Sequence, residues 1–145
     1  MKALIQRVSS SQVEVEGNVV GKINKGLLVL IGIEKQDIEI DADKMINKVL
    51  SYRVFPDENQ KMNLSLKDIK GDILVVSQFT LAADTKSGTR AGFSTAMPPN
   101  DAENLYNYVV EKIKAFNLKT ECGIFGADMS VSLINDGPVT FLLEV

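Results

Sequence analysis

The residues best suited to chemistry in this sequence directly follow a short apolar run over residues 73–76: they are Ser77, Gln78, Phe79 and Thr80. Such a run is typical of a buried strand, and ligands often bind beyond the carboxyl ends of strands in α/β sheets. Strand alternation puts Gln78 and Thr80 on the same face. We therefore predict that this segment positions a substrate, although hydroxyl groups that only cap a loop would explain the same residues.

The sequence contains no histidine and a single cysteine, Cys122. These counts exclude the Ser-His-Asp and Cys-His mechanisms and a metal site built from cysteine and histidine. No spacing of carboxylates indicates a magnesium site, so we expect neither a metal nor a cofactor. Any catalysis must then use carboxylates, hydroxyls, lysine, backbone groups, water or the substrate itself.

A second segment of interest is Asn135-Asp136-Gly137-Pro138, which separates two runs of strand-like residues near the end of the chain. The pattern predicts a hairpin whose connection contains Gly137 and Pro138. Glycine lacks a side chain and proline lacks a backbone donor, so a backbone carbonyl here can approach another molecule closely. A tight turn without a functional role would explain the same residues.

A long polar loop follows Leu81 and carries two cations, Lys86 and Arg90. Long loops in compact domains are often functional, although a solvated loop would have the same composition. The whole chain has 16 Lys and Arg against 19 Asp and Glu, a net charge of −3. This balance argues against a nucleic-acid coat protein, but a local basic patch can still hold the end of an RNA.

We expect one α/β domain over residues 1–145, because 145 residues suit one core and the chain is 45% hydrophobic and 24% charged. Its sheet should be mostly antiparallel, curved and barrel-like, with two main helices packed on it. The expected strands cover residues 2–9, 27–33, 61–66, 71–81, 119–134 and 139–145. Residues 12–20 should form a hairpin, because Gly17-Asn18 separates two valine-rich runs. The expected helices run from a cap at Asp37 to about Tyr52, and from a capping box of Asn100 and Glu103 to about Asn117. Each has one apolar stripe at helical spacing, which we expect to face the core: Ala42, Met45, Ile46, Val49 and Leu50 in the first helix, and Ala102, Leu105, Tyr106, Val109, Val110 and Ile113 in the second.

The composition also bears on location. No apolar run reaches the roughly 18 residues that cross a bilayer. Charge at Lys2 and Arg7 interrupts the N-terminal apolar residues too early for a signal peptide. Together with the single cysteine, these features predict a cytoplasmic protein with no membrane partner.

The segments Ser77-Gln78-Phe79-Thr80-Leu81 and Asn135-Asp136-Gly137-Pro138-Val139-Thr140 together resemble the D-aminoacyl-tRNA deacylases, also called D-tyrosyl-tRNA deacylases. Either motif alone is weak, but both in this order in a chain of this size are specific. The likeness covers nearly the whole chain and includes Gln6-Arg7-Val8, Gly26-Leu27-Leu28-Val29-Leu30, Val54-Phe55, Lys61-Met62-Asn63 with Ser65, and Phe125-Gly126-Ala127-Asp128-Met129.

The resemblance implies a three-layer α/β/β fold and a homodimeric hydrolase of translation quality control. Such an enzyme cleaves the ester between a D-amino acid and the 3′ end of tRNA, and also removes glycine mischarged on tRNA-Ala. A Gly-cisPro dipeptide from one subunit, here Gly137-Pro138, would enter the other subunit's site and reject L-amino acids, supported by Arg7. Phe125 and Met129 would pack on the terminal adenine, although without the resemblance they would be assigned to the core.

The lack of histidine shapes the expected mechanism. An internal threonine needs a base to act as a nucleophile, and none is evident near Thr80, so we disfavour that role. We expect instead a water molecule activated by the ribose 2′-hydroxyl of the tRNA. Backbone N–H groups of Phe79 and Thr80 would hold the oxyanion, while Ser77 and Gln78 orient the substrate.

The sequence departs from the family pattern in two places. The loop that usually reads Lys-Gly-x-Arg-Pro-Ser-Phe has an additional Ser87 here, and Ala91-Gly92 replaces Pro-Ser. Ser11 stands where alanine is usual. The resemblance implies contacts of Lys86 and Arg90 with the acceptor stem, from a loop whose sequence differs here from the family pattern. The alternatives are a small-molecule esterase on the same scaffold and a non-catalytic dimeric binding module.

Overall fold

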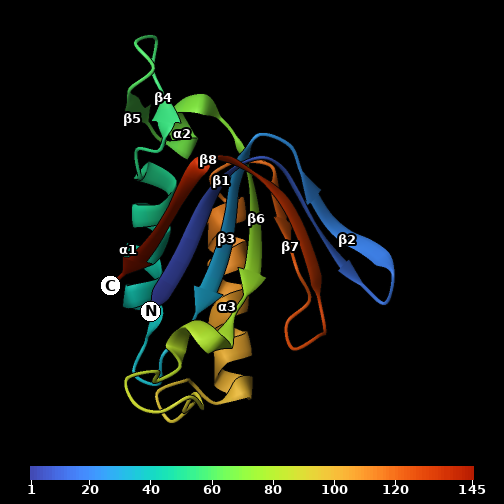
Figure 1. Ribbon diagram of the computed structural model, residues 1–145, viewed down its shortest axis with the longest axis vertical. Helices are drawn as coiled ribbons and strands as arrows, with labels where there is room; N and C mark the ends of the chain where they lie inside the picture. The colour runs from blue at the N-terminus through green and yellow to red at the C-terminus, as the bar shows by residue number, and fades with distance from the viewer.

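The computed structural model describes residues 1–145. A six-stranded sheet has the order β2-β1-β3-β6-β7, with β8 also paired to β1 (Figure 1). The elements in chain order are β1 (Lys2–Val15), β2 (Asn18–Ile23), β3 (Gly26–Gly32), α1 (Glu39–Ser51), β4 (Phe55–Pro56), β5 (Met62–Leu64), α2 (Leu66–Ile69), β6 (Asp72–Ser77), the 3-10 turn η1 (Phe79–Ala82), α3 (Pro99–Lys114), β7 (Thr120–Cys122) and β8 (Ser130–Glu144).

The long strand β1 organises the sheet because it pairs with three other strands. Its first half pairs with β3, its second half pairs with β2, and β8 runs antiparallel along nearly all of it. The sequence predicted two separate strands here, and this is wrong, since the chain continues through Ser10 and Ser11 without a break. Ser11 is buried and its hydroxyl donates to the Ser132 carbonyl at 2.9 Å, so this polar residue is satisfied within the sheet.

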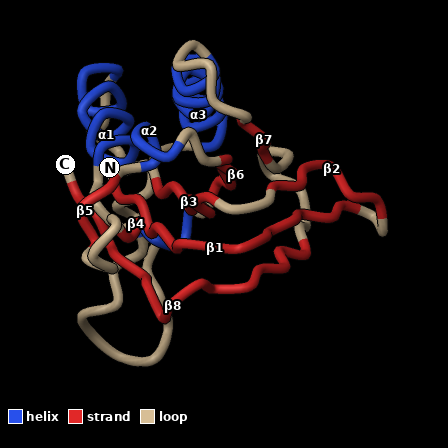
Figure 2. The backbone as a smooth tube through the Cα atoms, turned by 90° about the horizontal axis from the view of Figure 1, so that it is seen from above, coloured by secondary structure: helices blue, strands red, loops and turns tan.

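Strands β3, β6 and β7 are parallel, and helices α1 and α3 cover one face of the sheet they form (Figure 2). Strands β1 and β8 lie on the opposite side from the helices. This arrangement confirms the expected three-layer α/β/β fold with a curved sheet and two main helices. The third helix, α2, is a single short turn.

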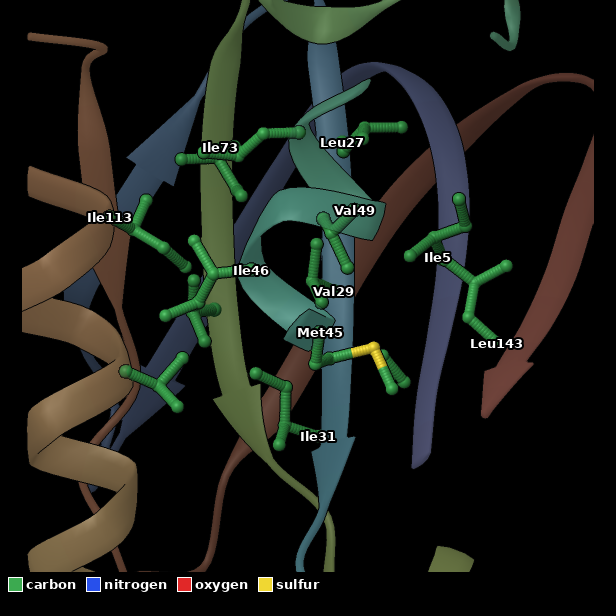
Figure 3. Close-up of a cluster of buried hydrophobic side chains, with 14 of the residues drawn as sticks. Ile5, Leu27, Val29, Ile31, Met45, Ile46, Val49, Ile73, Ile113 and Leu143 are labelled. Carbon is green, nitrogen blue, oxygen red and sulfur yellow. The ribbon is translucent and has the colours of Figure 1, made fainter. Parts of the chain in front are cut away.

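The core lies between the two helices and the sheet, and the predicted apolar stripes of both helices are buried there. Figure 3 shows Met45, Ile46 and Val49 of α1 in one cluster with Val29 and Ile31 of β3. The buried residues of the two helices are Ala42, Met45, Ile46, Val49, Leu50, Ala102, Leu105, Tyr106, Val109, Val110 and Ile113. Period 3.6 spacing of apolar residues was therefore a reliable guide to the faces that pack.

Both predicted helix caps are wrong. Asp37 does not cap α1, because its carboxylate accepts hydrogen bonds from the Glu34 N–H and the Met1 ammonium, both at 2.6 Å. The helix begins at Glu39 instead, and Asp41 accepts the Ile38 N–H at 3.2 Å. Asn100 lies inside α3, which starts at Pro99, since proline fits the first helical turn where no N–H donor is needed.

The predicted hairpin around Gly137-Pro138 is also wrong. Strand β8 pairs with β1 on both sides of this dipeptide, with Asn135 opposite Val8 and Thr140 opposite Gln6. The four residues 136–139 therefore face only Arg7 and bulge out of the ladder, and the Gly137-Pro138 peptide bond is cis. Proline has no N–H for a ladder hydrogen bond, so a bulge accommodates it within a paired strand.

No helix of the chain is long and apolar enough to span a membrane.

Candidate functional site

A cavity with a volume of about 480 Å³ lies at the C-terminal end of β6. Its walls come from the end of β6 and η1, from the start of α3, and from the loop between β7 and β8. Eleven of its 16 lining residues are hydrophobic, which suits a ligand with a flat apolar part. The lining residues are Ile31, Ile33, Val76, Ser77, Gln78, Phe79, Ala96, Met97, Pro99, Ala102, Phe125, Gly126, Ala127, Asp128, Met129 and Val131.

The structure thus brings together five of the predicted site residues from two distant segments: Ser77, Gln78, Phe79, Phe125 and Met129. Strand alternation does not describe them correctly, because β6 ends at Ser77 and the 3-10 turn η1 begins two residues later. The change of backbone geometry lets three consecutive residues line one cavity.

Backbone contacts hold the end of β6 in place. The Gln78 N–H donates to the Ile31 carbonyl of β3 at 2.7 Å, which extends the parallel pairing by one residue. A Cβ at Gly32 would lie 2.6 Å from the Leu81 Cβ, so the bare glycine lets η1 pack against the end of β3. The N–H groups of Phe79 and Thr80 open the turn, and the first donors of a helical turn have no acceptor within it. These two donors are available to a ligand oxygen.

Thr80 does not line the cavity, and its side chain is exposed. Its hydroxyl oxygen accepts a hydrogen bond from the Gln78 side-chain amide at 2.6 Å. An amide is not a base, so this contact positions the hydroxyl without activating it as a nucleophile.

Phe125 packs against Tyr106 of α3. The two rings lie 5.7 Å apart at an angle of 46°, and the Tyr106 hydroxyl donates to the Val75 carbonyl at 2.9 Å. Burial raises the pKa of Tyr106 well above its usual value, which keeps the hydroxyl protonated and able to donate. The partly buried Phe125 ring therefore rests on a fixed aromatic support.

Met129 owes its position to a glycine in the same loop. A Cβ at Gly123 would lie 2.5 Å from the Met129 Sδ, a distance that real side chains do not tolerate. The thioether instead occupies this space and packs on the small core of β1, β3 and β6. Because methionine is flexible and polarisable, it suits a wall that adapts to a flat ring.

Gly137 and Pro138 are exposed, and neither lines the cavity of its own chain. Arg7 lies beside them: its Nε donates to the Asp136 carbonyl at 2.7 Å and lies 3.3 Å from the Asp136 carboxylate. Another guanidinium nitrogen of Arg7 donates to the Val54 carbonyl at 2.6 Å. The guanidinium therefore ties the residue before the dipeptide to a neighbouring segment.

Asn135 is a positioning residue that the sequence did not single out. Its amide nitrogen donates to the carbonyls of Arg7 and Val139 at 3.1 and 3.0 Å, and its amide oxygen accepts the Val139 N–H at 3.2 Å. Asparagine side chains before a turn commonly form hydrogen bonds to the backbone a few residues further on. The Asn-x-Gly-Pro spacing could therefore have indicated this role of Asn135.

Lys86 and Arg90 lie on the exposed loop between η1 and α3, outside the cavity lining. Two hydrogen bonds between Asp84 and Gly92, at 2.8 and 3.0 Å, close the base of this loop. The predicted cations therefore stand at the tip of a closed loop that leaves from the same end of β6.

The chain contains no group of three or more His, Cys, Asp or Glu side chains that could hold a metal ion.

Comparison with known proteins defines the family of this chain. A family model described as D-Tyr-tRNA(Tyr) deacylase matches residues 4–144, and the chain therefore belongs to this family. Its relatives include proteins named D-aminoacyl-tRNA deacylase from Pseudoalteromonas translucida, 60% identical over 145 residues with full coverage of both chains, and from Vibrio cholerae, 60% identical over 144 residues with 99% coverage of both. The assignment of the chain to this family of ester hydrolases is thereby confirmed.

Solved structures share the fold of this chain. A structure titled c-Myc DNA Unwinding Element Binding Protein has a TM-score of 0.95 and 40% identity, and covers 100% of this chain and 99% of its own. A probable eukaryotic D-amino acid tRNA deacylase has a TM-score of 0.89, with coverage of 99% and 98%. It is only 14% identical, so it supports the fold alone.

Proposed function

We propose that this protein hydrolyses the ester bond between a D-amino acid and the 3′ end of tRNA, releasing the free D-amino acid and tRNA. The observation that carries the proposal is the cavity shared by Ser77, Gln78 and Phe79 of one motif and Phe125 and Met129 of another. Relatives that are 60% identical over the full length bear the name of this activity.

The terminal adenosine is proposed to rest against Phe125 and Met129, because an aromatic ring and a thioether suit a planar base. The ester then reaches the end of β6, where the open N–H groups of Phe79 and Thr80 can stabilise a developing oxyanion. Ser77 and Gln78 orient the aminoacyl group and the ribose. No metal or cofactor takes part in this scheme.

Water is the proposed nucleophile, with the ribose 2′-hydroxyl next to the ester assisting the proton transfer. The water oxygen bonds to the ester carbonyl carbon, and the bond from this carbon to the 3′ oxygen breaks. The proton lost by the water ends on the 3′ oxygen of the tRNA. This scheme needs no side-chain base, which fits a chain without histidine and a Thr80 hydroxyl that contacts only the Gln78 amide.

Stereochemical selection is proposed to come from a second copy of the chain. Gly137 and Pro138 are exposed, do not line the cavity of their own chain, and are held by Arg7 and Asn135, so they are available to a partner subunit's cavity. Their backbone carbonyls would face the α-carbon of the substrate, where an L side chain collides and a D side chain or hydrogen fits. Glycine on tRNA, including tRNA-Ala, is then also a substrate.

Exposed apolar residues of β8 offer a surface for this homodimer. Leu133, Ile134 and Leu142 are 37%, 63% and 54% exposed on either side of the Gly137-Pro138 bulge. Clustered exposed apolar side chains are typical of protein interfaces. Because its substrate is aminoacyl-tRNA, we place the protein in translation quality control in the cytoplasm.

Hydrolysis of matched D- and L-aminoacyl-tRNAs tests the proposal. We expect deacylation of the D form alone, and equal rates on both would refute the selector. Cleavage of a free amino-acid ester as fast as the tRNA ester would indicate a small-molecule esterase. Tight binding of tRNA without any hydrolysis would indicate a binding module instead.

A further inference from the structure

An exposed pair of aromatic rings stands at the mouth of the cavity. Phe79 and Phe93 are 61% and 46% exposed, and their ring centroids lie 5.1 Å apart at an angle of 48°. Phe79 lines the cavity and Phe93 does not, so the pair extends from the rim outwards. Two large aromatic side chains that contact each other and still face solvent form a ready apolar surface.

The position of Phe93 is fixed by the loop that carries it. The hydrogen bonds between Asp84 and Gly92 close the loop immediately before Phe93, and the Ala96 N–H donates to the Phe93 carbonyl at 3.1 Å. The Thr95 hydroxyl donates to the Ala82 carbonyl of η1, which ties the loop back to the turn that carries Phe79. The two rings are therefore held together by backbone contacts on both sides.

Two cations without acidic partners lie on the loop that carries Phe93. They are Lys86 and Arg90, and neither takes part in any ion pair of the chain. In a chain with a net charge of −3, two unpaired cations on one loop are a local departure from the overall charge. This combination of stacking surfaces and cations is how single-stranded nucleic acids are bound.

We propose that Phe79 and Phe93 form a stacking surface for the unpaired RNA nucleotide that precedes the terminal adenosine, with Lys86 and Arg90 near its phosphate. The inference rests on the proposed function, because it assumes that the adenosine occupies the cavity against Phe125. Phe79 lines that cavity and contacts Phe93, so an RNA strand leaving the cavity at this rim passes directly over the pair.

Direct binding measurements test the surface without relying on hydrolysis. The probes are the RNA tetranucleotide ACCA and adenosine 5′-monophosphate, titrated into the wild-type protein, Phe93→Ala and Phe93→Tyr. We expect Phe93→Ala to weaken binding of ACCA by about tenfold and to leave binding of the mononucleotide unchanged, because stacking acts on the second base. Phe93→Tyr should restore most of the affinity, since it keeps an aromatic face.

Several outcomes would overturn the inference. These are equal losses for both probes, no loss for either, or tighter binding of the DNA tetranucleotide than of the RNA. A change in the oligomeric state of Phe93→Ala in sedimentation would assign the pair to a subunit interface instead. If wild-type protein fails to cleave D-aminoacyl-tRNA while the binding pattern holds, the proposed function fails and the stacking surface stands.

Salt dependence tests the two cations separately from the rings. The logarithm of the ACCA affinity should fall with the logarithm of salt concentration, and each lost phosphate contact should reduce that slope by about 0.7. We expect such a reduction for Lys86→Ala or Arg90→Ala, and none for the control Lys22→Ala on β2. An unchanged slope in both loop variants would show that Lys86 and Arg90 do not contact the RNA phosphates.

Discussion

Asn135 and Val139 are bonded to each other twice across the Gly137-Pro138 dipeptide. The Asn135 amide nitrogen donates to the Val139 carbonyl at 3.0 Å, and the Val139 N–H donates to the Asn135 amide oxygen at 3.2 Å. A third bond joins Asn135 to the Arg7 carbonyl of β1. One side chain thus closes the bulge and anchors it to the sheet, and an asparagine is needed because the role requires both a donor and an acceptor.

Asn135→Asp should loosen the bulge. The carboxylate keeps the acceptor for Val139 but loses both donors and faces two carbonyl oxygens, which should cost about 1–3 kcal/mol of stability. We expect slower cleavage of D-aminoacyl-tRNA and a smaller ratio between D and L rates. The control is Asn47→Asp, an exposed residue of α1 with one hydrogen bond to the Asp43 carbonyl. An unchanged D/L ratio in Asn135→Asp would show that the bulge does not select.

Arg7→Lys should also impair selection. An ammonium group cannot reproduce the fork by which Arg7 reaches the Asp136 and Val54 carbonyls together. We expect a lower melting temperature and a reduced D/L ratio in matched deacylation assays. Arg53→Lys is the control, since Arg53 is exposed and forms no ion pair. Selectivity equal to wild type would mean that the bulge keeps its position without the guanidinium.

Thr80→Val separates two mechanisms. If Thr80 contributes its backbone N–H and not its hydroxyl, the variant should keep turnover within about tenfold of wild type, a loss of about 1.4 kcal/mol or less. Single-turnover hydrolysis of D-aminoacyl-tRNA measures this rate, with circular dichroism to verify the fold. Thr89→Val on the exposed loop is the control. Near-complete loss of turnover in a folded Thr80→Val protein would instead establish the hydroxyl as the nucleophile.

Gly123→Ala should reshape the adenosine wall. The new Cβ would lie 2.5 Å from the Met129 Sδ and push the thioether from its place. Because the sulfur lies near the end of a flexible side chain, the shift should change the wall of the base site at little cost in stability. We expect weaker binding of adenosine 5′-monophosphate in calorimetric titrations. Gly92→Ala is the control, because the nearest atoms to its Cβ would be 3.9 Å away. Equal affinities for the two variants would argue against Met129 as a wall of the base site.

Acid stability should depend on two hydrogen-bonded carboxylates. Bonds from the Ser65 hydroxyl and backbone N–H lower the pKa of Asp68, and bonds from the Lys61 N–H and the Asn63 side chain lower the pKa of Asp57. A pKa below its unfolded value stabilises the fold above the unfolded pKa of about 3.9, and this stabilisation is lost as pH falls through the folded value.

Urea unfolding between pH 7 and pH 2 measures this effect. We expect the free energy of unfolding to fall below about pH 4, and Asp68→Asn to be less stable at pH 7 with a shallower acid decline. Glu58→Gln is the control, because this exposed carboxylate next to Asp57 accepts no hydrogen bond. Parallel pH curves for wild type and Asp68→Asn would refute the assignment.

The sequence predicted the helix faces residue by residue because periodic burial depends only on local spacing. It failed where the outcome depended on a partner strand. The local sequence cannot show whether Gly137-Pro138 reverses the chain or forms a bulge within one strand. The outcome depends on whether the residues on both sides of the dipeptide pair with β1, as they do here. The break expected at Ser10 was wrong for the same reason, because Ser11 finds its partner in the distant Ser132.

The candidate site was predictable in its membership but not in its geometry. The strand-end motif supplied Ser77, Gln78 and Phe79, and the family resemblance supplied Phe125 and Met129; the structure brings these two segments together in the cavity. The exposed position of Thr80 followed from the 3-10 turn, which strand alternation could not anticipate. Asn135 was missed because its role is seen only once the bulge is closed.

The location of Gly137 and Pro138 outside the cavity of their own chain has a genetic consequence. In the proposed dimer, each working site combines one chain's cavity with the other chain's dipeptide. Two alleles, one damaged at Gly137 and the other at the end of β6, should therefore complement each other when expressed together. Each mixed pair would retain one intact site, and neither allele alone would support proofreading.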